Sequence, residues 1–167
     1  MWCLMILLFQ TFSQSILISI FYQVWSFYRS RFAKLTIVPN YFSAVNENSF
    51  QLPNLINLSL KNNRIQVLGK TSLRYLKNLK SINLSGNPLY WVSPSAFWPN
   101  KALKQLYLNK TQLEYLTDEH LRPIDDFLDT LDLHEMPNLR MDPNIALSGV
   151  WKCLTADQRP ESFWNQI

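Results

Sequence analysis

The sequence predicts an α/β solenoid, with a short parallel sheet along its concave face and irregular or short helical segments on its convex side. Two observations predict this fold. A motif of apolar residues at fixed spacings begins at Leu55, Leu79 and Leu103, so its period is 24 residues. A second apolar pattern fills the interval between consecutive motifs. Repeats of this length bury their apolar faces only by stacking against neighbouring repeats.

The motif reads L-x-x-L-x-L-x-x-N-x-L and is clearest at residues 79–89, where Ile82 takes the second leucine position. Variants of it begin at Phe32 and Leu128, which brings the expected number of repeats to about five. Apolar and polar residues alternate in each motif with a period of two, as in a half-buried strand. Each repeat is therefore expected to contribute one short strand to a parallel sheet.

An asparagine follows the strand in three repeats, at Asn40, Asn63 and Asn87. The chain must turn inward there, and the backbone groups of a buried turn need hydrogen-bond partners. Because a side-chain amide both donates and accepts, we expect these asparagines to connect adjacent turns as a ladder. Thr111 keeps part of this capacity and Met136 none, so the ladder should fail near residue 136 and the chain should be least regular beyond it.

The convex half is predicted from the apolar residues that recur after each motif. Phe97 is the most prominent of them, and Trp91 and Trp98 on either side of it are expected to pack rather than to stack on a ligand. The other expected convex core residues include Leu68, Leu73, Val92 and Leu121.

The chain begins with an apolar leader, residues 1–24, for which three interpretations stay open. A secretory signal fits the compact apolar run and the small residues after it, although no basic residue precedes the run. A membrane anchor fits the length of residues 1–22, although Gln10, Gln14 and serines dilute it. A degenerate repeat that packs on the next one is the third. Repeats are expected over residues 25–147, and residues 148–167 form an irregular C-terminal tail.

The net charge is +4, but its distribution along the chain is uneven. Residues 29–110 contain 12 Lys or Arg and one acidic residue, whereas residues 111–167 contain 4 and 11. The split indicates either two partner-facing patches of opposite sign or solvated loops, and charge runs usually mark solvated surface. The basic residues are scattered and form no arginine-rich run, so nucleic acid is not an expected partner.

The sequence predicts no cofactor, no metal site and no enzymatic activity. The two cysteines, Cys3 and Cys153, form no C-x-x-C pair. The histidines at 120 and 134 do not stand beside a plausible nucleophile. The aspartates do not follow a calcium-loop spacing and are expected to form a solvated acidic surface: Asp125, Asp126, Asp129 and Asp132.

Over residues 25–147 the repeats resemble the typical class of leucine-rich repeat, the 24-residue form with a phenylalanine on the convex side. The resemblance implies a secreted or cell-surface ectodomain, part of a receptor or adhesion protein, whose sheet or edges bind a protein ligand or co-receptor. Members usually carry cysteine-rich caps, and none is visible here, which implies either a fragment of a longer ectodomain or an incomplete gene model. The alternative is an intracellular, cytoplasmic scaffold or adaptor with Cys153 reduced. Residues 1–24 would provide membrane association if they form an anchor.

The expected concave face consists of the positions between and beside the motif leucines. We expect a partner to centre on Tyr107 with Asn83, Asn109 and Asp132, because tyrosine is favoured as an anchor at interfaces. The other candidate binding residues are Ser59, Lys61, Gln105 and His134. The three expected columns are Lys34, Asn57, Ser81, Gln105 and Thr130; then Thr36, Ser59, Asn83, Tyr107 and Asp132; then Val38, Lys61, Ser85, Asn109 and His134.

Three N-glycosylation sequons begin at Asn57, Asn83 and Asn109. In a secreted protein each could carry a glycan. All three lie in or beside expected strands, so glycans there would obstruct the concave face. Glycosylation and protein binding at this face are therefore competing hypotheses.

Overall fold

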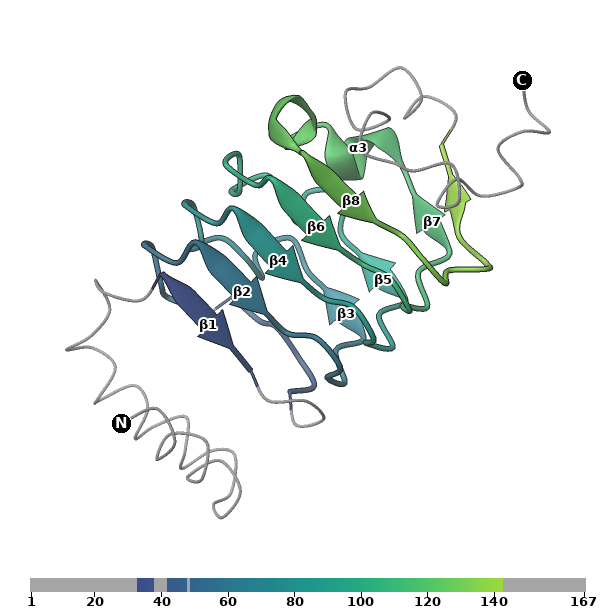
Figure 1. Cartoon of the computed structure of the whole chain (residues 1–167), viewed down its shortest axis with the longest axis horizontal. Helices are drawn as coiled ribbons and strands as arrows, with labels where there is room; N and C mark the ends of the chain where they lie inside the picture. Colours follow the sequence, from purple (N-terminus) through teal and green to yellow (C-terminus); the bar gives the residue numbers. More distant parts are fainter. Residues whose placement is uncertain (1–32, 38–41, 48, 143–167) are drawn as a thin grey trace, which may run out of the picture.

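The computed structural model describes residues 33–37, 42–47 and 49–142, and they form a solenoid whose turns stack side by side (Figure 1). One parallel sheet of five strands runs along it in the order β1-β2-β4-β6-β8. The predicted fold class is confirmed. The five strands are β1 (Lys34–Thr36), β2 (Asn57–Ser59), β4 (Ser81–Asn83), β6 (Gln105–Tyr107) and β8 (Thr130–Asp132).

The register of this sheet places equivalent repeat positions side by side. The middle residue of each strand is apolar, and these residues form one column directed into the core. Residues on either side of each middle position are partly or fully exposed, because successive side chains of a strand point to opposite faces. The core column consists of Leu35, Leu58, Ile82, Leu106 and Leu131.

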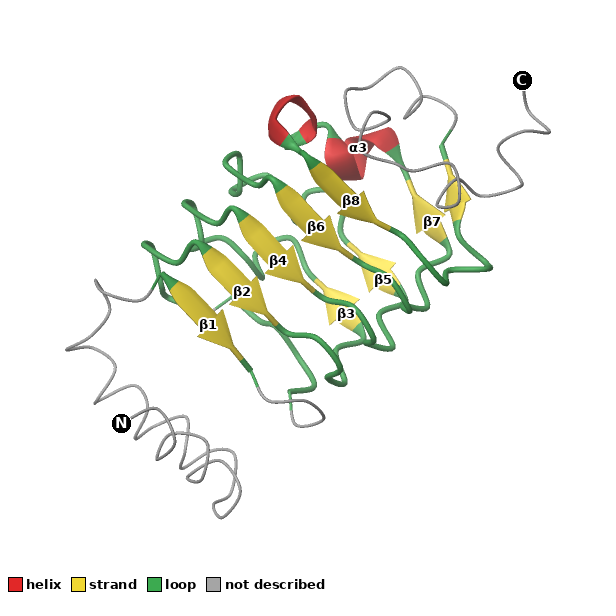
Figure 2. Cartoon of the chain, viewed as in Figure 1, coloured by secondary structure: helices red, strands yellow, loops and turns green. Residues whose placement is uncertain are grey.

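The convex side consists mainly of turns, with two small parallel sheets and little helix (Figure 2). Strand β3 (Val67–Leu68) pairs with β5 (Trp91–Val92), and β7 (Tyr115–Leu116) pairs with β9 (Arg140–Met141). One short α-helix, α3 (Asp118–Leu121), and one 3-10 helix, η1 (Asp125–Phe127), precede β8.

A continuous apolar core separates the concave and convex sides. Phe97 is completely buried in it, together with the leucines of the motif. Trp91 and Trp98, which were expected to pack beside Phe97 rather than to stack on a ligand, lie outside this core, since they are 46% and 55% exposed. Trp91 precedes buried Val92 in a strand, so its side chain points to the opposite face, toward solvent.

Each strand of the concave sheet from β2 onward is followed by a turn that contains one left-handed residue. These residues have φ angles of 55–69° and each directly precedes a ladder position, at a spacing of 24 or 25 residues. Only glycine adopts this conformation without a steric cost, and in three of the four turns the residue is not glycine. The four residues are Asn62, Gly86, Lys110 and Glu135.

Asn63 and Asn87 hold consecutive turns together through their side-chain amides. The Oδ1 atom of Asn87 accepts the backbone N–H of Ile65 at 3.0 Å, and that of Asn63 accepts the backbone N–H of Phe42 at the same distance. Their Nδ2 atoms both donate to the carbonyl oxygen of Leu60, at 2.9 and 3.0 Å. Asn40 lies outside the described residues.

The expectation that Met136 has no hydrogen-bonding capacity is wrong. The hydroxyl of Thr111 donates to its thioether sulfur at 3.8 Å, and sulfur is a weak acceptor. Arg140 and Met141 form strand β9, and most of the chain beyond residue 136, which was expected to be the least regular part, lies outside the described residues. The left-handed residues Lys110 and Glu135 show that the backbone geometry of the turn persists after the asparagines end.

The apolar leader, residues 1–24, and the tail, residues 148–167, lie outside the described part of the chain. Within the described part, no helix has the length and apolarity that crossing a membrane requires.

Candidate functional site on the concave face

Tyr107 lies on β6 between two polar residues of the neighbouring strands. The register pairs it with Asn83 on β4 and with Asp132 on β8. All three are partly exposed on the side of the sheet opposite to the core column. Adjacent strands are about 4.8 Å apart, so one partner side chain can reach all three positions.

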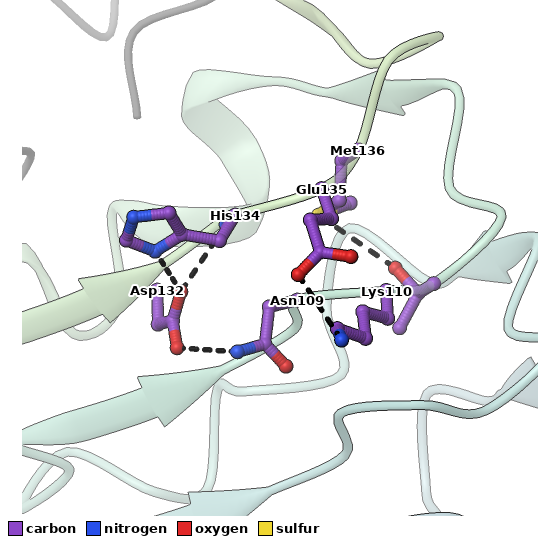
Figure 3. A network of polar contacts seen from close by, with 7 residues as sticks. Asn109, Lys110, Asp132, His134, Glu135 and Met136 are labelled. Carbon is purple, nitrogen blue, oxygen red and sulfur yellow. Dashed lines mark hydrogen bonds and ion pairs between the residues drawn. The ribbon is translucent and has the colours of Figure 1, made fainter. Parts of the chain in front are cut away.

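A polar network fixes the side chains at the C-terminal ends of β6 and β8 (Figure 3). One carboxylate oxygen of Asp132 accepts from Nδ2 of Asn109 at 2.6 Å. The other accepts the backbone N–H of His134 at 3.1 Å and lies 2.9 Å from Nδ1 of the same histidine. Because an ionised carboxylate only accepts, Nδ1 of His134 carries a proton.

An ion pair lies next to this network, in the adjoining inward turns. Nζ of Lys110 is 3.1 Å from Oε1 of Glu135, and both side chains are more than half exposed (Figure 3). The backbone N–H of Lys110 also donates to the carbonyl oxygen of His134 at 3.1 Å. An exposed pair of this kind contributes at most about 1 kcal/mol to stability, so its main effect is on the local charge pattern.

The structure brings together five of the eight residues expected to bind, on β4, β6 and β8 and in the turns after β6 and β8: Asn83, Tyr107, Asn109, Asp132 and His134. Asn83 also accepts the backbone N–H of Ser85 at 3.0 Å. The remaining three occupy other positions of the same face: Ser59 pairs with Asn83 in the register, Gln105 begins β6, and Lys61 is exposed after β2.

Ser85 differs from its expected place. It was expected in the third column of the concave face, but it is 2% exposed, and its hydroxyl has no hydrogen-bond partner among the described residues. Val38, in the same column, lies outside the described residues.

The three sequon asparagines have different surroundings. The amide nitrogen of Asn109 donates to Asp132, and the amide oxygen of Asn83 accepts from Ser85. Asn57 lies at the first position of β2, between Lys34 and Ser81 in the register. The third sequon residue is partly exposed at Ser59, whereas Ser85 and Thr111 are buried.

His120 has a structural place in the last described turns. It is 6% exposed, and its Nδ1 accepts the backbone N–H of Thr117 at 3.1 Å. Its Nε2 therefore carries the proton and donates to the carbonyl oxygen of Val92 at 3.0 Å. The sequence offered no signal for this role beyond the spacing of Thr117 and His120, which matches a capping box with histidine in place of glutamate.

Metal-ligand clusters and surface hollows would indicate another kind of site. The described residues include no group of three or more side chains that could hold a metal ion. An open hollow of about 370 Å³ lies on the convex side instead, lined by Glu114, Tyr115, Pro137, Asn138, Leu139 and Arg140.

Comparisons with known proteins agree with this architecture. The family profile described as Leucine rich repeat matches residues 30–89 and 53–113. A chain in the structure of the Toll–Spatzle complex from Drosophila is 25% identical, with a TM-score of 0.58 over 67% of this chain. A leucine-rich repeat protein of Leptospira interrogans is 28% identical, with a TM-score of 0.59 over 72% of this chain.

This chain spans 16% of the length of the Toll–Spatzle chain and 30% of that of the Leptospira protein. No curated protein sequence matches it. The family profile covers half of the chain, the motif spacing is that of the family, and the fold is the solenoid that this spacing predicts. The chain belongs to the leucine-rich repeat family.

Proposed function

We propose that this chain is a protein-binding segment of a secreted or cell-surface protein, and that it binds its ligand through the concave face around Tyr107. The observation that carries the proposal is the place of Tyr107 between Asn83 and Asp132 on adjacent strands. Tyrosine gives a large contact area together with a polar end, and it is enriched among the residues that dominate interface energies.

The network beside Tyr107 supports the proposal, because it holds polar groups in fixed positions before a ligand arrives. Asp132 is bonded to both Asn109 and His134, and its side chain is only 17% exposed. Side chains that are already ordered lose less conformational entropy on binding. The ordered polar groups and the ring of Tyr107 together favour a partner that contacts the ring and brings hydrogen-bond donors to the groups beside it.

Family membership supports the general function, since leucine-rich repeat proteins are generally binding modules without enzymatic activity. The Drosophila structure is that of a complex between Toll and Spatzle. For this chain, a protein ligand and an extracellular or membrane location are part of the proposal. The alternative is a cytoplasmic scaffold or adaptor that uses the same face.

Two tyrosines allow a matched test of the concave face. Tyr107 lies on the concave sheet, whereas Tyr115 lies on convex strand β7 and is 55% exposed. A panel of purified ectodomains and secreted proteins is screened with the wild-type chain, and each hit is measured again with Tyr107→Ala and Tyr115→Ala. We expect Tyr107→Ala to weaken binding about 30-fold, as for an interface hot spot, and Tyr115→Ala to leave it unchanged. Intact binding by Tyr107→Ala would reject the concave site.

The location is tested separately by expression of the chain in a secretory cell line. An extracellular location is supported if the chain is secreted and its electrophoretic mobility increases after glycosidase treatment. Retention inside the cell without glycan favours the scaffold alternative. Glycans mapped to Asn83 or Asn109 would contradict the binding site itself, since they would cover the positions beside Tyr107.

A further inference from the structure

Three segments of the chain lie side by side along one edge of the solenoid, each leading into a strand of the concave sheet (Figure 1). We call residues 69–80, 93–104 and 117–129 the leading segments; they lead into β4, β6 and β8. Backbone hydrogen bonds join their ends, because Lys104 N–H donates to Lys80 O and Asp129 N–H donates to Lys104 O, each at 2.8 Å. Asn100 adds a side-chain bond to Leu76 O at 2.7 Å.

The charge of the leading segments reverses along this edge. Segment 69–80 contains four basic residues and no acidic one, and segment 93–104 contains two basic residues and no acidic one. Segment 117–129 contains five acidic residues and one basic one. The uneven charge of the sequence is therefore collected on a single edge of the fold, in the order basic, weakly basic, acidic.

Several of these charges have no ion-pair partner in the described part of the chain. Arg74 pairs with Glu47, Lys104 with Asp129, and Arg122 with Asp118. The other exposed charges of the three segments are Lys70, Lys77, Lys80 and Lys101 on the basic side, and Glu119 and Asp126 on the acidic side. Neighbouring like charges on this edge repel one another. A partner that brings charges of opposite sign to the edge therefore lowers the electrostatic free energy.

The middle leading segment carries an exposed apolar residue. Trp98 is 55% exposed, although tryptophan is among the side chains with most to gain from burial. The edge thus has an aromatic residue at its centre, a basic segment on one side and an acidic segment on the other. An apolar centre with a charged rim is the usual anatomy of a protein interface.

We infer that this edge is a self-association surface, on which a second copy of the chain binds in the antiparallel direction. A two-fold axis near Trp98 sets segment 69–80 of each copy against segment 117–129 of the other. The two tryptophans meet at the axis, and both flanks join opposite charges. A surface that is complementary to itself in this way produces a closed dimer. The edge lies outside the concave face, so this inference is independent of the proposed ligand site.

Charge reversal on either flank provides a decisive test by sedimentation of the full chain over a range of concentrations. The basic-flank variant is Lys77→Glu with Lys80→Glu, and the acidic-flank variant is Glu119→Lys with Asp126→Lys. Each variant alone removes the attraction on both sides of the axis, and we expect the dimer dissociation constant to rise at least about tenfold. In a mixture of the two variants, both flanks of the mixed dimer again join opposite charges, so mixed dimers should be tighter than either variant dimer.

Matched controls separate this surface from general effects of charge and folding. Lys34→Glu with Arg64→Glu changes the net charge by the same amount at exposed residues outside the leading segments, and it should dimerise like the wild type. Trp98→Ala should abolish dimerisation, whereas Trp91→Ala, at a residue 46% exposed on β5, should not. Circular dichroism establishes that each variant is folded.

The inference is overturned if the wild-type chain remains monomeric up to on the order of 100 μM, because interfaces of standard size have dissociation constants in the micromolar range or below. It is also overturned if both flank variants dimerise as well as the wild type, or if the mixture is no tighter than its components. Tyr107→Ala, which tests the ligand site, should dimerise normally.

Discussion

Nδ2 of Asn87 donates to the carbonyl oxygen of Leu60, one turn earlier in the solenoid, at 2.9 Å. The same amide also accepts the backbone N–H of Ile65 at 3.0 Å and donates to the carbonyl oxygen of Leu84 at 2.7 Å. Asn87 is 1% exposed, so water cannot replace these bonds. One side chain therefore satisfies backbone groups of two consecutive turns.

Replacement of Asn87 should be severely destabilising. Asn87→Ala leaves the buried N–H of Ile65 without a partner and also opens a cavity, and we expect a loss of about 3 kcal/mol or more in the free energy of unfolding. Thr111→Val, at the equivalent position two turns from Asn63, loses only a weak bond to sulfur and should cost less than about 1 kcal/mol. Urea denaturation of both variants measures the difference, and equal losses would contradict the ladder as described.

At the left-handed positions, loss of a glycine should lower stability and gain of a glycine should raise it. Gly86 has a φ of 69°, and a Cβ atom there would lie 2.1 Å from Oδ1 of Asn62, so Gly86→Ala should cost about 1–2 kcal/mol. Lys110 has a φ of 57°, and Lys110→Gly should raise stability by about 0.5–1 kcal/mol despite the loss of the exposed pair with Glu135.

Lys110→Gln is the control for this comparison, because it removes the charge but keeps the strained backbone. Thermal unfolding should place it at or slightly below the wild type. A stability of Lys110→Gln equal to that of Lys110→Gly would show that the charge, and not the backbone, determines the effect.

Asn100 should tolerate an apolar replacement but not an acidic one. Its side chain is completely buried, and its Oδ1 has no donor among the described residues. Leu76 and Ile124, which are apolar, occupy the equivalent position in the neighbouring repeats. The carbonyl oxygens of Leu73 and Leu76, which accept from Asn100, also accept backbone N–H groups and would keep these partners without it. We expect Asn100→Leu to change stability by no more than about 1 kcal/mol.

Asn100→Asp should cost about 3 kcal/mol or more at neutral pH, because it buries an unpaired carboxylate. Chemical denaturation measures both variants, and a tolerated aspartate would contradict this account of the site.

Asp132 should affect ligand binding more than folding. Asp132→Ala releases Asn109 and His134 at the partly exposed end of β8, so the free energy of unfolding should fall by no more than about 1–2 kcal/mol. The ligand found with the wild-type chain should bind at least about tenfold more weakly, because the polar groups beside Tyr107 lose their fixed positions. Calorimetric titration beside denaturation curves separates the two effects. Unchanged affinity would place the ligand elsewhere.

Much of the candidate site could be predicted from the spacing of the sequence. A strict repeat with one three-residue strand per turn allows only one register, so Asn83, Tyr107 and Asp132 had to be neighbours. The bonds from Asp132 to Asn109 and His134 could not be predicted, because they depend on the path of the turn after each strand. The exposure of Trp91 and Trp98 could not be predicted for a similar reason, since the convex segments have no regular period from which to deduce which side chains face inward.

The sequence by itself determined the solenoid, its register and its apolar column, because stacked repeats can bury their leucines in only one way. The tertiary structure alone decided three things: the left-handed turns at Lys110 and Glu135, the weak hydrogen bond from Thr111 to the sulfur of Met136, and the burial of Ser85. It also collected charges from distant parts of the sequence onto one edge around Trp98. Residues that are 24 positions apart become neighbours only when the turns stack. The electrostatic field of their charges, and the surface that they expose together, therefore exist only in the folded chain.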